Sequence, residues 1–455
     1  MGACSKSCAK GPESDMKQDS KRDRALLLVQ WNSVILVSVA DLVSHFNRNA
    51  IGVMREAITA EIAMSSTAFG TLSAISTYSY LLLQLPLGIL ADRFGIRRVL
   101  ALGCFVTALG SLVFGSAAGM PGIFLGRFLM GAGLAVPGMA LQKLVAGWFE
   151  NSRASTVIGI GCGIGSLGAL LSQFPLTAWL HVATWRSIYF SFAAFTAAIG
   201  IATVLTMRNS PEDLAAHRER QKNRASSTPA GPSLRDILKN IAGTFANRRI
   251  WPVYFILFVQ MGLYQVFAST WAVSYLERSF GLSGTQASAY TSCLMIGMMT
   301  ASTLIGGVSD QLRSRKKVFL ALYFCLALSW VLLTFFGEFI YASGVLWPVM
   351  LLLGVSATAS QIGHAYVRDV TDPRFVGTSI SCVSLINMLG GALAPVFCGI
   401  YMDSLEAKGF SGLALYRRAF TPLTVLAILS FAVVIFFIRE TGCRNRWGEW
   451  RQAER

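Results

Sequence analysis

The sequence predicts an all-α membrane protein with twelve transmembrane helices in two pseudo-symmetric six-helix bundles. Three observations predict this fold. First, the chain of 455 residues is 54% hydrophobic and only 14% charged, and its apolar stretches of about 18 to 25 residues are long enough to cross about 30 Å of hydrocarbon. Second, a charged, glycine-marked segment at residues 88–98 recurs in degraded form at 306–316. Third, the lysines and arginines gather on one side of the apolar stretches.

The candidate spans divide evenly around a polar segment at residues 208–249. This segment is rich in Arg, Lys, Ser and Pro, so we expect a flexible cytoplasmic linker, with a short amphipathic helix near Leu234–Ala246. On either side of it we expect an N-terminal bundle at 25–207 and a C-terminal bundle at 250–438, flanked by a disordered cytoplasmic tail at 1–24 and a cytoplasmic tail at 439–455. The predicted spans cover residues 29–54, 66–87, 99–118, 121–146, 154–181, 187–207, 251–276, 285–307, 317–336, 344–366, 376–401 and 418–438.

The two copies of the charged segment align at one constant offset. Gly88 matches Gly306, Asp92 matches Asp310, and the basic pair that ends the first copy matches the basic pair that ends the second. A loop motif that recurs between hydrophobic spans indicates a chain of two related halves.

The charged segment has two interpretations. Its ion pairs and helix caps could hold the two halves together in one state and release them in another, which makes it a gate. Alternatively, it is a plain charged loop. The repetition of the segment in the second half of the chain favours the gate over this alternative. The candidate gating residues are Gly88, Asp92, Arg93, Gly95, Arg97, Arg98 and Asp310.

The distribution of positive charge predicts the orientation. With both termini cytoplasmic, thirty of the 39 lysines and arginines lie on the cytoplasmic side, six lie on the outer side and three lie inside spans. The net charge of +16 is therefore a positive-inside signature whose partners are anionic membrane lipids rather than nucleic acid. We expect a monomeric, multi-pass protein of the cell inner (plasma) membrane.

A polar face in the first span carries the sharpest functional signal. Asp41, His45 and Arg48 are spaced four and three residues apart, which places them on one side of a helix. Charged groups inside a membrane usually face a cavity or a partner. Arg48 could therefore pair with an anionic substrate while Asp41 or His45 exchanges a proton. In the alternative interpretation, Asp41 and Arg48 form an internal ion pair that locks the helix.

Other polar residues inside spans are weaker candidates for contact with substrate or protons. Arg127 lies among glycines in the fourth span, where it could sense protonation, pair with substrate or reach the membrane interface. Single polar stripes in several helices are what a shared central cavity requires, although such stripes also occur in core packing. These further candidates are Gln260, Tyr264, Gln361, His364 and Asn387. The cysteines and histidines have no metal-site spacing, and we expect no cofactor.

The chain resembles the major facilitator superfamily over residues 25–440. The segment Gly88-Ile-Leu-Ala-Asp-Arg-Phe-Gly-Ile-Arg-Arg98 looks like the family's loop motif between helices 2 and 3, and Gly126-Arg-Phe-Leu-Met-Gly-Ala-Gly133 is similar to its helix 4 motif. The second loop copy departs from the pattern, because Arg313 replaces the glycine and Gln311 the arginine.

Two further features are similar to the anion:cation symporter branch of that family. They are Phe46-Asn-Arg-Asn-Ala-Ile-Gly52, and Ala135-Val-Pro-Gly138 followed by Trp148, Phe149 and Arg153. The resemblance implies that Arg48 contacts organic anions, because the helix 1 arginine does so in that branch. The acidic residue of helix 4 in the branch is absent here, since the segment from Ala132 to Ala135 contains none.

These observations predict a secondary active transporter of a small organic solute, most simply an organic anion taken up with protons. The resemblance implies alternating access, with the site between the bundles near the bilayer midplane. No phosphate-binding loop of the ATPase type is present, and no nucleophile–base constellation predicts an enzyme. Two alternatives are a proton-driven exporter of apolar compounds, with Arg127 as its critical charge, and a non-transporting membrane sensor or scaffold.

Overall fold

The computed structural model describes residues 12–149, 151–208, 245, 248–371 and 376–444, and within these residues the chain is helical and has no strand. The N-terminal half contains α1 (Pro12–Val53), α2 (Arg55–Glu61), α3 (Ser66–Phe94), α4 (Ile96–Ser116), α5 (Met120–Gly133), α6 (Pro137–Trp148), α7 (Asn151–Leu171), α8 (Phe174–Leu180) and α9 (Trp185–Thr206). The C-terminal half contains α12 (Trp251–Tyr264), the π-helix η2 (Gln265–Trp271), α13 (Ala272–Phe280), α14 (Gly284–Gln311), α15 (Arg315–Phe335), α16 (Gly337–Ala342), α17 (Leu346–Ser356), α18 (Ala359–Val370), α19 (Val376–Glu406) and α20 (Gly412–Phe437).

The described helices account for the twelve predicted spans. Ten stretches are long and apolar enough to cross a membrane, and the pair α7–α8, bent by 43°, makes an eleventh. The twelfth is α3, whose 29 residues extend for about 43 Å at 1.5 Å per residue. The predicted fold class is confirmed: this is a multi-pass, all-helical membrane protein of two six-helix bundles.

Four predicted spans are interrupted rather than continuous. The span at 121–146 breaks before Pro137, and the span at 154–181 breaks before Pro175, because proline offers no N–H to the preceding turn. Between α17 and α18, the hydroxyls of Ser356 and Thr358 donate to carbonyls three residues back, at 2.6 and 2.8 Å, and so compete with the helical pattern. The fourth interruption is η2, which separates α12 from α13.

The repeated charged segment is mostly helix, so the prediction of a loop is wrong for its first copy. Helix α3 continues to Phe94, and the chain turns at Gly95, whose φ of 84° suits glycine. Gly88 does not end α3 earlier, because a single glycine inside a helix is tolerated at a modest energetic cost. In the second copy, Arg313 occupies a left-handed position (φ 46°) where the first copy has glycine.

The N-terminal tail also differs from the prediction. Helix α1 begins at Pro12, and residues 12–24 are therefore helical rather than disordered; proline is favoured at a first helical position, and no glycine or proline follows before Gly52. Residues 1–11 lie outside the described residues. The same holds for most of the linker at 208–249, including all of the expected helix near Leu234–Ala246 except Phe245, and for residues 445–455.

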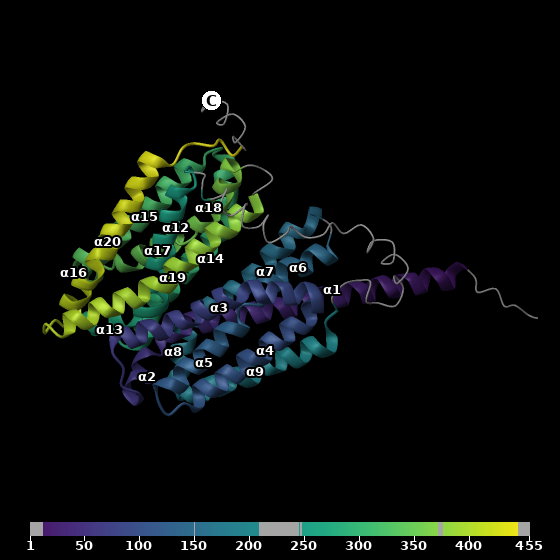
Figure 1. The fold of residues 1–455 in the computed structure, drawn as a ribbon, viewed down its shortest axis with the longest axis horizontal. Helices are drawn as coiled ribbons and strands as arrows, with labels where there is room; N and C mark the ends of the chain where they lie inside the picture. Colours follow the sequence, from purple (N-terminus) through teal and green to yellow (C-terminus); the bar gives the residue numbers. More distant parts are fainter. Residues whose placement is uncertain (1–11, 150, 209–244, 246–247, 372–375, 445–455) are drawn as a thin grey trace, which may run out of the picture.

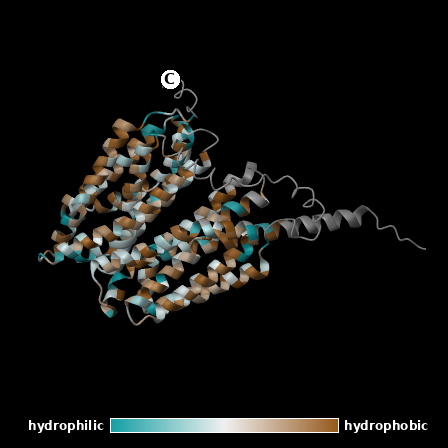
Figure 2. Ribbon diagram, viewed as in Figure 1, coloured by the Kyte–Doolittle hydropathy of each residue, from teal (hydrophilic) through white to brown (hydrophobic). Residues whose placement is uncertain are grey.

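The two bundles meet at one end and diverge towards the other (Figure 1). We call the meeting end, which carries α2, α8 and α13, the closed end, and the opposite end the open end. Helix α3 packs against α19 and α7 against α14 across the bundle boundary, while α1 contacts η2. Apolar residues cover the flanks of both bundles in Figure 2, and polar residues gather at the helix ends and along the boundary.

Candidate functional site

The polar face of α1 lies in the interior of the protein, near the bundle boundary. The carboxylate of Asp41 lies 3.8 Å from the imidazole of His45, one turn further along the helix. The Asp41 side chain is 13% exposed and that of His45 is 35% exposed. The imidazole of His45 lies against α7, since a Cβ atom on Gly165 would be 3.5 Å from its Cδ2, and a third of the side chain remains exposed.

Arg48 continues this face and has no carboxylate partner in the part of the chain that the structure describes. Its guanidinium lies over the ring of Tyr80 on α3, with 5.5 Å between Cζ and the ring centroid. The next residue, Asn49, contacts the other bundle, since its Oδ1 lies 3.5 Å from the hydroxyl of Tyr264. Among the described residues Arg48 forms no ion pair, so the alternative Asp41–Arg48 lock is absent, and the carboxylate of Asp41 lies near His45 instead.

The glycines of α7 make room for the Asp41 side chain. A Cβ atom on Gly165 would lie 2.4 Å from an Asp41 oxygen, and one on Gly168 would lie 2.0 Å from the carbonyl oxygen of Leu42. By contrast, Gly163 and Gly159 have nothing within 4 Å of such a Cβ. One face of α7 therefore lets α1 approach closely and sets where the Asp41 carboxylate lies.

Arg127 is buried against α1. It has no exposed surface, so the interpretation in which it reaches the membrane interface is wrong. Its Nη1 donates to the carbonyl oxygen and the Oδ1 of Asn47, at 3.0 and 2.5 Å. Because Asn47 directly precedes Arg48, these two hydrogen bonds fix the rotation of α1 about its axis. They thereby fix the direction in which Arg48 points.

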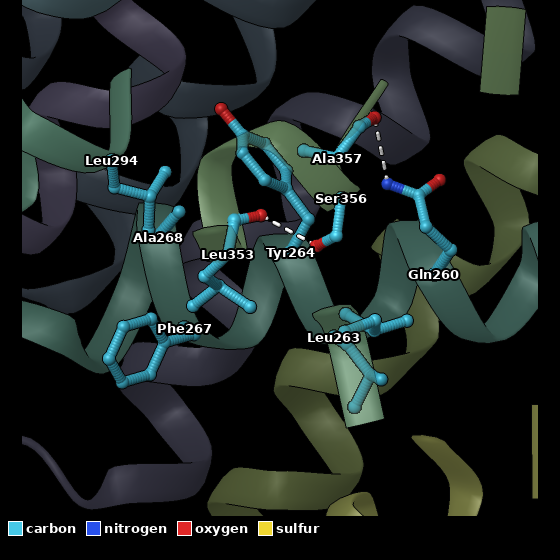
Figure 3. A pocket seen from close by; sticks show the side chains of 10 residues that line it. Gln260, Leu263, Tyr264, Phe267, Ala268, Leu294, Leu353, Ser356 and Ala357 are labelled. Carbon is cyan, nitrogen blue, oxygen red and sulfur yellow. Dashed lines mark hydrogen bonds between the residues drawn. The ribbon is translucent and has the colours of Figure 1, made fainter. Parts of the chain in front are cut away.

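Gln260 and Tyr264 line a small, mainly apolar pocket in the C-terminal bundle (Figure 3). The amide nitrogen of Gln260 donates to the carbonyl of Ala357 at 3.0 Å, and its Oε1 is buried without a hydrogen-bond partner. The Tyr264 hydroxyl lies 3.5 Å from Oδ1 of Asn49 on α1. Tyr264 thus connects the pocket to the polar face of α1.

The remaining predicted residues lie along α18 and α19. Gln361 is exposed and His364 is half-buried, and the His364 Nε2 is 2.9 Å from the hydroxyl of Ser384 on α19. Asn387 is buried and donates to the carbonyl of Leu257 at 3.1 Å. Asn387 therefore ties α19 to α12, whereas Gln361 and His364 offer neutral hydrogen-bonding groups at the surface of the C-terminal bundle.

Asn49 and the π-helix η2 form a contact that the sequence analysis missed. Asn49 Oδ1 accepts a hydrogen bond from Ser269 at 2.7 Å, and Ser73 and Thr270 share one at 2.9 Å. A Cβ on Gly52 would lie 2.6 Å from the Ser269 carbonyl oxygen, so glycine is required for this approach. The sequence does carry a signal here, because Asn47 and Asn49 flank Arg48 inside an apolar span.

Ionic contacts join the bundles at the closed end, and these also were not predicted. The guanidinium of Arg55 is buried over the rings of Trp271 and Phe69, 4.6 and 5.3 Å from their centroids. Beside it, Glu56 pairs with Arg278 across the boundary at 3.1 Å. Burial favours the neutral form of Glu56, but the hydrogen bond from Arg278 and the charge of Arg55 outweigh it, and the pKa of this carboxyl is lowered.

A carboxylate from the C-terminal bundle caps a helix of the N-terminal bundle. Asp403 on α19 accepts hydrogen bonds from the backbone N–H groups of Ser66 and Thr67, at 2.7 and 2.9 Å. These are orphan donors at the start of α3, where a negative charge is favoured. The closed end is therefore held by charge-assisted hydrogen bonds as well as by packing.

The predicted gating residues lie at the open end. Lys143 donates to the carbonyl of Gly88 at 3.0 Å, and Arg97 donates to that of Val204. In the second copy, Asp310 pairs with Arg315 at 2.9 Å, within its own bundle. Gly95 makes the turn, Arg93 and Arg98 are exposed, and the side chain of Asp92 lies outside the described residues.

Comparison with known proteins identifies the family. The family model described as "Major Facilitator Superfamily" matches residues 37–359 and 253–448. The chain is 23% identical to the hexuronate transporter of Bacillus subtilis (strain 168), over 88% of this chain and 93% of that protein. It is 24% identical to a probable L-galactonate transporter of Escherichia coli (strain K12), over 85% and 86%. A D-xylose–proton symporter shares its fold, with a TM-score of 0.71, 15% identity, and coverage of 92% of this chain and 100% of that one.

The glycine face of α7 generates a first prediction. We expect Gly165→Ala to displace the Asp41 carboxylate and lower the free energy of unfolding by about 1–3 kcal/mol, the usual effect of overpacking. Gly163→Ala is the matched control, because it adds the same methyl group where nothing lies within 4 Å. Thermal unfolding of the two purified variants measures the difference. Equal stability of both variants would contradict the assigned packing.

Proposed function

The chain belongs to the major facilitator superfamily, and from this we propose that it carries a small organic anion across the membrane together with protons, by alternating access. The family and the relatives named above are transporters rather than enzymes. Both of these relatives are named for sugar-acid anions. The proposal extends that substrate class to this chain.

Arg48 is the observation that carries the proposal. A guanidinium inside a membrane span is costly unless it has a partner, and among the described residues Arg48 contacts the face of Tyr80 but no carboxylate. Arginine presents paired donors that match a carboxylate. Tyr80 of the N-terminal bundle lies under Arg48, and the hydroxyl of Tyr264 in the C-terminal bundle lies 3.5 Å from Oδ1 of the adjacent Asn49. An anion bound there would contact both halves of the protein, as a site between two moving bundles requires.

The Asp41–His45 pair supports proton coupling. The two side chains lie 3.8 Å apart and both are ionisable near the bound anion. A carboxyl and an imidazole at this distance can exchange a proton through a water molecule that bridges them, and both side chains are partly exposed. We therefore assign proton uptake to this pair and substrate binding to Arg48.

The arrangement of the bundles supports an assignment of sides. The charge distribution favours cytoplasmic termini in the cell inner membrane, and α1 begins and α20 ends at the open end (Figure 1). On this assignment the structure is inward-facing, and the closed end is the outer gate. Opening that gate requires the loss of the Glu56–Arg278 pair and of the Asp403 cap on α3.

The proton-driven export of apolar compounds is the second candidate. It would make Arg127 the critical charge, whereas Arg127 is buried and bound to Asn47. The apolar pocket beside Tyr264 is the observation that favours this alternative. The Arg48 variants described next distinguish the two functions.

We expect Arg48→Ala to abolish anion uptake into proteoliposomes, with at least a tenfold loss of affinity. A charge-assisted hydrogen bond contributes about 1.5–3 kcal/mol, and about 1.4 kcal/mol corresponds to a factor of ten. Arg48→Lys keeps the charge but loses the paired donors, and should retain weak transport. Counterflow of labelled anion measures both. If Arg48→Ala moved the anion as well as the wild type does, the site assignment would fail.

We expect Asp41→Asn to uncouple transport from protons. In the wild type, an inwardly directed proton gradient should drive accumulation of the anion, and a protonophore should remove it. The variant should lose gradient-driven accumulation, while counterflow, which needs no net proton movement, should continue. Uptake by the wild type that is indifferent to collapse of the pH gradient would falsify the coupling.

A further inference from the structure

A carboxyl group at the closed end takes no part in the function proposed above. We propose that Glu277, on α13, is a second proton-binding site, and that the proton bound there keeps the closed end closed. This site is separate from the Asp41–His45 pair, and the inference does not require an anion at Arg48. It is carried by the way in which the side chains of the closed end are paired.

Glu56 binds the two arginines of this part of the structure. Its Oε1 lies 3.1 Å from Nη1 of Arg55 and 3.1 Å from Nη2 of Arg278, and it accepts a hydrogen bond from Ser274 at 3.2 Å. Ser274, Glu277 and Arg278 are three and four residues apart on α13, so they lie on one face of that helix. Glu277 is therefore next to a carboxylate that already has its partners.

Glu277 has no such partner. It is half-buried, and in the part of the chain that the structure describes its Oε2 is buried without a hydrogen bond and no ion pair reaches it. A Cβ atom on Gly284, at the start of α14, would lie 2.9 Å from Oε1 of Glu277 and 3.5 Å from Cγ2 of Thr177 on α8. Because α8 belongs to the N-terminal bundle, the carboxyl group lies at the boundary between the bundles.

Other charged side chains at the closed end have contacts of their own. Glu61 on α2 pairs with Arg186 at 2.9 Å, and Glu406 on α19 accepts a hydrogen bond from the start of α3. On α20, Arg417 and Arg418 lie over aromatic rings. Helices η2 and α14 contribute no charged side chain at this end. Glu277 is therefore the carboxyl group here whose charge is not matched by a direct contact.

His181, directly after α8, is a second group that titrates near neutral pH. Its Nε2 lies 2.7 Å from the hydroxyl of Thr285, across the boundary. A hydroxyl group both donates and accepts hydrogen bonds, so this contact can persist when the imidazole gains a proton. The response to pH is therefore assigned to Glu277, and a variant of His181 serves as a control.

Closure of this end favours the protonated form of Glu277. An ionised carboxylate with a buried oxygen and no partner is costly, whereas the protonated acid carries no charge. When the bundles part, water reaches the carboxyl group, which then ionises above the ordinary glutamate pKa of about 4.3. The parted state releases a proton that the closed state keeps, so acid favours closure, and this preference is lost as the pH rises.

Distances across the closed end test the inference on the full-length protein in lipid vesicles. Nitroxide labels are attached to Ala60→Cys on α2 and Ala407→Cys after α19, two exposed positions, in a background whose native cysteines are replaced by serine or alanine. Pulsed double electron–electron resonance then gives the ratio of short to long distances at pH 5.0 and pH 8.0. The labelled background is compared with Glu277→Gln, Glu277→Asp, His181→Gln and Glu338→Gln, the last of which changes an exposed carboxyl group on α16.

We expect the ratio of short to long distances in the labelled background to fall at least tenfold between pH 5.0 and pH 8.0. Release of one proton changes such a ratio by up to about tenfold per pH unit. Glu277→Gln, which stays uncharged, should keep the short distance at both pH values, whereas Glu277→Asp should retain the response. His181→Gln and Glu338→Gln should respond as the background does.

Three outcomes would overturn the inference. They are a ratio that does not change with pH in the labelled background, an undiminished response in Glu277→Gln, and loss of the response in His181→Gln. The first needs no substitution at Glu277, so the inference can fail even if the Glu277 variants do not fold. Each of these outcomes leaves the proposed anion transport intact, because the Arg48 variants test that separately.

Discussion

An arginine without a carboxylate, inside a membrane span, is the constraint on which this structure depends. A charge at this depth is tolerated only in a polar or hydrated environment. Three features surround Arg48: the ring of Tyr80 beneath it, the partly exposed imidazole of His45 on the same face of α1, and a boundary between bundles that diverge towards one end. The rotation of α1 is fixed from behind, by the bond between Arg127 and Asn47. Arg315, by contrast, pairs with Asp310 in its own bundle.

The closed end explains how a site between two bundles can be accessible from one side only. Its contacts are of a kind that can be made and broken. The carboxylate of Asp403 binds backbone N–H groups that would otherwise be bound by water, and Glu56 pairs with a partly exposed Arg278. Such contacts are worth little in net free energy because water replaces them readily.

The packing of η2 on α1 restricts the sequence more strictly. Only glycine at position 52 allows the two backbones to approach so closely. The π-helix brings Ser269 and Thr270 to the boundary directly beyond Arg48 and Asn49, so the site and the closed end are parts of one contact surface.

Much of the architecture was accessible from the sequence, because hydrophobic length and charge asymmetry are physical requirements of a membrane span. The face formed by Asp41, His45 and Arg48 was also accessible, since helical periodicity places these residues together without any tertiary information.

The turn at Gly95 was not located. In a sequence, a glycine that precedes a new helix cannot be told from a glycine inside a helix, because the difference lies in the φ angle. Pairings across the boundary, such as Asn49 with Ser269 or Asp403 with the start of α3, were beyond reach for a different reason. They join residues more than 200 positions apart, and a single sequence contains no signal for such distances.

The central claim is that an anion sits on Arg48, between the bundles, and a structure with a bound anion tests it most directly. The measurement is a cryo-electron microscopy or crystallographic map of the protein with an anion that raises its melting temperature. We expect the carboxylate within about 3 Å of the Arg48 guanidinium nitrogens, as for a charge-assisted hydrogen bond, with the body of the anion between Tyr80 and Tyr264. An anion bound elsewhere, with Arg48 still resting on Tyr80 alone, would contradict the account.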